Sequence, residues 1–70
     1  MNFSQCQALI ADLERDPRRL PVYHGELEAA VSWLMDCTFE STDPAEKTRL
    51  AALELRARGV LERFRKANMN

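Results

Sequence analysis

The segment from residue 21 to residue 38 is apolar around most of the circumference that it would have as a helix. One stripe at helical spacings of three and four consists of Tyr23, Leu27, Ala30, Val31, Leu34 and Thr38. A neighbouring stripe and its flanks add Ala29, Trp33, Met35, Cys37 and Phe39. An apolar band of this width exceeds what one adjoining helix covers. We therefore expect this segment to contact more than one partner.

A shorter apolar stripe occupies the start of the chain and consists of Phe3, Cys6, Leu9, Ile10 and Leu13. Ser4 is followed three residues later by Gln7, which is the spacing of a capping box and predicts a helix start. Pro17 disfavours helix at the residue before it. The pattern therefore predicts a first helix over residues 5–15.

Two prolines indicate where the later helices begin. Proline is favoured at the first helical position, so Pro21 and Pro44 predict helices over residues 21–38 and 44–67. Asp43 precedes the second proline as a candidate N-cap, and Glu46 completes a capping-box-like pair.

The third helix carries an apolar seam at alternating spacings of three and four: Leu50, Leu53, Ala57, Val60, Phe64 and Ala67. About three heptads fit, at or below the number that a coiled coil usually needs. The seam therefore favours the inner edge of a helical hairpin or bundle, with the alternative that two chains share it. The short loops expected around residues 17–20 and 39–43 favour antiparallel neighbours. We predict an all-α fold of one domain over residues 1–70, a short first helix packed on a helical hairpin.

Composition narrows the class of protein. Hydrophobic residues make up 46% of the chain and charged residues 30%, a balance typical of a folded soluble domain. No stretch approaches the roughly 20 apolar residues of a membrane span, and the first residues do not resemble a signal peptide. We expect a cytoplasmic protein with reduced thiols at Cys6 and Cys37. Arginine outnumbers lysine eight to two, which favours a bacterial or phage origin.

Charge is distributed unevenly along the chain. Residues 1–43 carry eight acidic and three basic residues, a net charge of −5, whereas residues 44–70 carry three acidic and seven basic residues, a net charge of +4. Opposite charges of this kind favour a compact arrangement. We expect the arginines of the third helix to pair with the acidic second helix.

Residues with catalytic or metal-binding chemistry are few. His24 is the single histidine, and neither a Cys-x-x-Cys nor a His-x-x-x-His spacing is present. Glu26 and Glu28 are two residues apart and do not share a helical face. We expect no enzyme activity, no cofactor and no metal site.

A basic face on the third helix leaves a second functional class open. Its members recur near the seam: Arg49, Arg56, Arg58, Arg63 and Arg65. They could contact nucleic-acid phosphates. Alternatively they flank a packed seam, cover apolar atoms with their stems and pair with acidic side chains.

The leading hypothesis is a non-enzymatic protein-binding module, a small inhibitor, anti-activator or adaptor that binds and modulates a larger bacterial regulatory protein. Large aromatic and apolar side chains dominate binding energy at protein interfaces. The expected interface with a partner or a second copy consists of Tyr23, Leu27, Trp33, Leu34, Met35 and Phe39. We expect a homodimer with Trp33, Leu34 and the third-helix seam near its interface.

Overall fold

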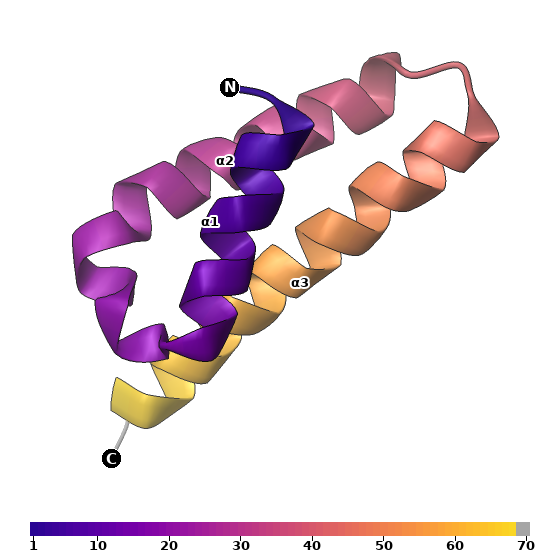
Figure 1. Ribbon diagram of the computed structural model, residues 1–70. Helices are drawn as coiled ribbons and strands as arrows, with labels where there is room; N and C mark the ends of the chain where they lie inside the picture. Colours follow the sequence, from indigo (N-terminus) through magenta and orange to yellow (C-terminus); the bar gives the residue numbers. More distant parts are fainter. Residues whose placement is uncertain (69–70) are drawn as a thin grey trace.

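The computed structural model describes residues 1–68, with side chains described as far as Lys66. The chain forms α1 (Phe3–Arg15), a short 3-10 helix η1 (Pro17–Arg19), α2 (Leu20–Glu40) and α3 (Pro44–Asn68) (Figure 1). No residue from 1 to 68 lies in a strand. The predicted all-α class with three main helices is confirmed.

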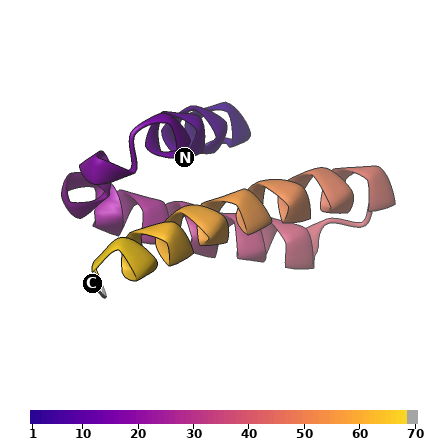
Figure 2. The same ribbon diagram turned by 90° about the horizontal axis from the view of Figure 1, so that it is seen from below.

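The three helices form two layers. Helices α2 and α3 run antiparallel as a hairpin joined through residues 41–43, and α1 lies against one side of that hairpin (Figure 2). The most extensive packing is between α2 and α3. The molecule is elongated, with extents of 42 × 19 × 17 Å. The predicted packing of a short first helix on a hairpin is therefore confirmed.

Helix α1 begins two residues earlier than the sequence pattern predicted, because Asn2 and not Ser4 is its N-cap. The Asn2 side chain accepts a hydrogen bond from the Gln5 amide at 2.8 Å, and the Gln5 side chain accepts one from the Asn2 amide at 3.0 Å. Asparagine is among the best N-cap residues. The earlier start brings Phe3 into the helix.

Helix α2 also starts earlier than predicted, at Leu20. Asp16 caps η1 by accepting a hydrogen bond from the Arg18 amide at 3.3 Å, and η1 then continues directly into α2. The predicted start of α3 is confirmed, since the Asp43 side chain accepts a hydrogen bond from the Ala45 amide at 3.0 Å and Pro44 is the first helical residue.

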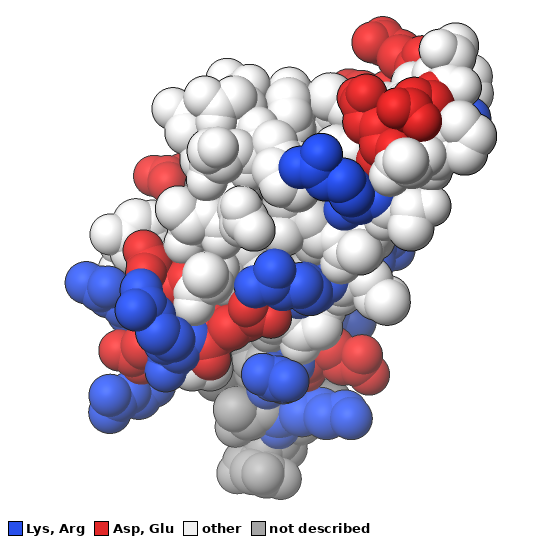
Figure 3. Space-filling view, turned by 45° about the vertical axis from the view of Figure 1, so that its right-hand side comes forward, with Lys and Arg blue, Asp and Glu red and all other residues white. Residues whose placement is uncertain are grey.

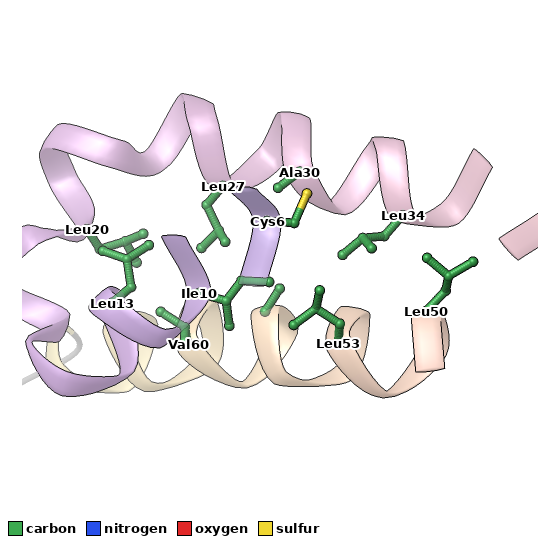
Figure 4. Packing of buried hydrophobic residues seen from close by; sticks show 11 residues of the cluster. Cys6, Ile10, Leu13, Leu20, Leu27, Ala30, Leu34, Leu50, Leu53 and Val60 are labelled. Carbon is green, nitrogen blue, oxygen red and sulfur yellow. The ribbon is translucent and has the colours of Figure 1, made fainter. Parts of the chain in front are cut away.

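The core lies where the three helices meet (Figure 4). Its buried side chains are Cys6, Ile10 and Leu13 of α1, Leu20, Leu27, Ala30 and Leu34 of α2, and Leu50, Leu53, Ala57 and Val60 of α3. The predicted α3 seam is thus core as far as Val60, Phe64 packs against it in part, and the Ala67 side chain lies outside the described part. Both cysteines are free.

Candidate protein-binding surface

The residues predicted to form an interface do not lie together. Leu27 and Leu34 are fully buried inside the chain's own core, because α1 and α3 together cover the side of α2 on which they lie. These two residues, like the buried part of the α3 seam, are not available to a partner of the folded chain. The prediction that Leu27 and Leu34 lie at an interface is therefore wrong for the folded chain.

Tyr23 and Trp33 both pack against the core and remain partly exposed. Trp33 lies on the side of the hairpin that α1 covers, because it lines a groove together with Phe3. Trp33 helps to line a groove at one end of the molecule, here called the end groove, with Phe3, Cys37, Asp43, Ala45, Glu46, Arg49 and Leu50. The Arg49 guanidinium lies 5.0 Å from the centre of the Phe3 ring, a cation–π geometry. The walls of the end groove therefore include two aromatic side chains, one of which is in contact with Arg49.

The other side of the hairpin carries exposed apolar side chains. Met35 is 48% exposed and Phe39 is 90% exposed on α2. Leu55 is 71% exposed at the outer edge of α3, where it lines one groove with Arg58 and another with Glu14 of α1. Residues two apart in a helix point about 200° away from each other. Because Trp33 faces the α1 side, Met35 faces the opposite side.

The same reasoning applies to α3. Arg56 contacts α1, so Arg58, two residues on, points away from α1. Two rows of exposed residues at spacings of three and four follow this side of the hairpin. We call this surface the open face and define it by Glu28, Ser32, Met35 and Phe39 of α2 and Lys47, Ala51, Leu55 and Arg58 of α3.

Arg58 links the two rows of the open face. One of its terminal nitrogens lies 3.6 Å from the Met35 sulfur, and its Nε donates to Glu54 at 3.1 Å. Leu55 and Arg58 also line a shallow groove along α3 with Leu61, Glu62, Arg65 and Lys66. The open face thus combines apolar side chains with a basic border.

The five arginines predicted as a basic face are divided between two sides of α3. Arg56 donates two hydrogen bonds to Glu14 of α1, at 3.2 and 2.5 Å. These bonds lower the pKa of Glu14 and raise the pKa of Arg56. Among the described side chains this is the one ion pair between helices, so the expected pairing of α3 with α2 is wrong.

The remaining arginines do not restore a continuous basic surface. Arg49 covers Phe3, and Arg63 lies on the side of Arg56, whereas Arg58 and Arg65 border the open face. In the view of Figure 3, basic and acidic side chains alternate over the lower half of the molecule, and acidic side chains gather at the end that carries the α2–α3 connection. This geometry does not favour a phosphate-binding surface, for which clustered bases are needed.

The candidate chemical residues are dispersed. His24 is exposed, with its Nδ1 3.5 Å from Glu28. Burial raises the pKa of both thiols, Cys6 and Cys37, which disfavours the reactive thiolate. Over the described part of the chain, no three His, Cys, Asp or Glu residues come together as metal ligands. No helix there has both the length and the apolar character needed to cross a bilayer.

Comparisons with protein families, with characterised proteins and with solved structures give no match. The functional interpretation therefore depends on the surfaces just described. Of these, the open face has the most exposed large apolar side chains, whereas the end groove is lined by partly buried ones.

Proposed function

We propose that the chain is a non-catalytic protein-binding module, a small inhibitor, anti-activator or adaptor that binds a larger protein through the open face. The observation that carries this proposal is the exposure of Met35 and Phe39 on one side of the hairpin, with the exposed Leu55 at the outer edge of that side. Exposed apolar surface of this kind, bordered by polar residues, is typical of protein interaction sites.

The energetics of burial support such a role. Covering a fully exposed side chain of the size of Phe39 contributes about 2–3 kcal/mol before association costs. Met35 and Leu55 add smaller amounts because they are already partly covered. Lys47 and Arg58 border these residues and would favour a partner with acidic groups around an apolar centre.

Several observations support a non-catalytic role. Catalysis needs polar groups that converge on one concave site. His24 points to solvent beside Glu28, while Cys6 is buried in the core and Cys37 lies at the end groove. These candidate groups lie on different parts of the molecule.

The test is site-specific photo-crosslinking in cells that express the chain naturally. A crosslinking residue placed at Phe39 should capture a protein much larger than the 8.1 kDa chain. The matched control is Val22, which is 80% exposed on the same helix but lies off the open face. Equal capture from both positions, or capture of no larger protein from Phe39, would contradict the proposal.

A functional assay of the captured protein then separates the proposed roles. Addition of the purified chain lowers the partner's activity if the chain is an inhibitor or anti-activator, and leaves it unchanged while recruiting a third protein if the chain is an adaptor. Phe39→Ser should abolish either effect, whereas Val22→Ser should preserve it, because only the first substitution removes apolar surface from the open face.

A further inference from the structure

We infer that the open face also binds the open face of a second copy, so that two hairpins stack as the two layers of a four-helix bundle with each α1 outside. This inference rests on the proposed function, because it uses the same surface and gives that surface a competing occupant. The interface differs from the one predicted from the sequence, since Leu34 and most of the α3 seam are buried within each chain.

Charge selects the arrangement of the two copies. Of the residues that define the open face, α2 contributes the acidic Glu28 and no lysine or arginine, whereas α3 contributes Lys47 and Arg58 and no acidic residue. A two-fold axis perpendicular to the helices would place α2 on α2, acid against acid. An axis parallel to the helices places each α2 on the α3 of the other copy, which is electrostatically favoured.

An axis parallel to the helices also determines which residues face each other, because it leaves every residue at its own level along the hairpin. Within one chain, Leu34 lies at the level of Leu50 and Leu53, and Leu27 at the level of Val60 (Figure 4). The two helices are antiparallel with about the same rise per residue. The α3 residue that lies opposite any open-face residue of α2 can therefore be found by counting along both helices from these core positions.

Counting in this way places three open-face residues of α2 opposite complementary residues on α3 of the second copy. Glu28 is level with the backbone of Arg58 of the partner subunit, and the two form an acid–base pair when that guanidinium turns from Glu54 and Met35 of its own chain. Met35 is level with Ala51 of the partner subunit, where a small side chain leaves room for a large one. Phe39 is level with Lys47 of the partner subunit, whose aliphatic stem can cover an aromatic ring.

The size of the face suits a stable dimer. The long side of the molecule, 42 by 19 Å, has an outline of about 800 Å², which is an upper limit for the area that one copy contributes and compares with the roughly 800 Å² that each partner buries in a standard interface. A chain of 70 residues also lies in the size range where association commonly supplements a small core.

Such a dimer would regulate the proposed function. It covers Met35 and Phe39, so a larger partner and a second copy compete for the same surface. By mass action, dimerisation then lowers the apparent affinity for the partner as the concentration of the chain rises.

The first test is the molar mass of the full chain by size-exclusion chromatography with light scattering, from about 1 to 100 μM, a range that spans micromolar affinities. The expected mass at the upper end is twice 8.1 kDa. Phe39→Ser should shift the chain to monomer, and the matched control Val22→Ser should remain dimeric. Circular dichroism checks that each variant keeps its helices.

The second test is a charge exchange. Glu28→Arg and Arg58→Glu should each weaken dimerisation about tenfold or more, because each pair occurs twice in the dimer. The combination of both substitutions should restore it. Glu26→Arg makes the same charge change two residues away, off the open face, and should have little effect.

The outcomes separate this inference from the proposed function. A chain that stays monomeric throughout the range, or a dimer that tolerates Phe39→Ser, overturns the inference. Failure of the combined charge variant to recover overturns the arrangement with α2 on α3. None of these results affects the crosslinking of a larger protein, whose mass distinguishes it from a second copy.

Discussion

The two sides of the α2–α3 hairpin differ in what covers them, although the same two helices build both. On one side α1 supplies Ile10 and Leu13 to a core that holds Leu34 at zero exposure. On the other side, Met35, the next residue in the chain, is about half exposed. The position of α1, rather than the composition of α2, therefore decides which apolar stripe becomes core and which remains surface.

Arginines show the same contrast. Arg56 on the covered side holds α1 to α3 through Glu14, whereas Arg58, two residues on, pairs within its own helix with Glu54 and contacts the Met35 sulfur. A side chain of the same type therefore forms an ion pair between helices on one side, and on the other side an ion pair within its own helix and a contact with the sulfur of the neighbouring helix.

The greatest change in the free energy of unfolding is expected at Leu34, and the adjacent Met35 provides its control. Leu34→Ala should lower the free energy of unfolding by about 2–5 kcal/mol, because it leaves a cavity in the core. Met35→Ala should change it by less than about 0.5 kcal/mol. Urea denaturation followed by circular dichroism, in a Phe39→Ser background that keeps the chain monomeric, measures both. Similar losses of unfolding free energy for the two variants would contradict the difference in packing between the two sides of the hairpin.

The capping residue of α1 gives the next effect. Asn2→Ala should cost about 1 kcal/mol, because the Gln5 amide loses its acceptor. Ser4→Ala should be nearly neutral, since Ser4 is exposed inside the first turn. Hydrogen exchange should show faster exchange in α1 and little change in α2 and α3. Equal loss of protection in all three helices would mean that α1 does not unfold independently of the hairpin.

Two helical glycines offer a gain of stability that leaves the core untouched. Gly25 and Gly59 lie inside α2 and α3, without positive φ, and a Cβ added at either would meet no atom within 4 Å. Each Gly→Ala substitution should therefore raise the free energy of unfolding by about 0.5–1 kcal/mol. Thermal denaturation measures this gain, and a decrease at either position would indicate a hidden steric contact.

The smallest effect concerns the ion pair between Glu14 and Arg56. Because the folded state lowers the pKa of Glu14 below its ordinary value of 4.5, the pair stabilises the fold above that pH, and its contribution disappears as pH falls through the lowered pKa. Glu14→Gln should lower Tm at pH 7 by less than about 4 °C. In acid, the Tm of Glu14→Gln should equal that of the unchanged chain. A difference in Tm that persists in acid would exclude the ion pair as the cause of the difference.

Local signals in the sequence predicted much of this fold. Asp43 and Pro44 specify a helix start through their own backbone chemistry, and the α3 seam follows from periodicity. The sequence pattern predicts a connector at Leu20, because nothing local shows that η1 continues into α2 and buries this residue. Asn2 and Ser4 are both good N-caps, and their competition is decided by which side chain finds its reciprocal partner, Gln5 or Gln7.

The binding surface was harder to predict than the fold. Periodicity identified α2 as apolar around most of its circumference, and it grouped Leu34 with Met35 and Phe39. Separating them requires the position of α1, which depends on long-range packing by residues such as Ile10. Met35 and Phe39 remain predicted binding residues, while Leu34 is part of the core.

The placement of the two thiols has a practical consequence. Cys6 lies on α1 with almost no exposed area, whereas Cys37 lines the partly open end groove. A thiol-specific reagent should therefore modify Cys37 in the closed protein and reach Cys6 only when α1 lifts away. The ratio of the two labelling rates reports how often the first layer separates from the hairpin, without any label being engineered into the chain.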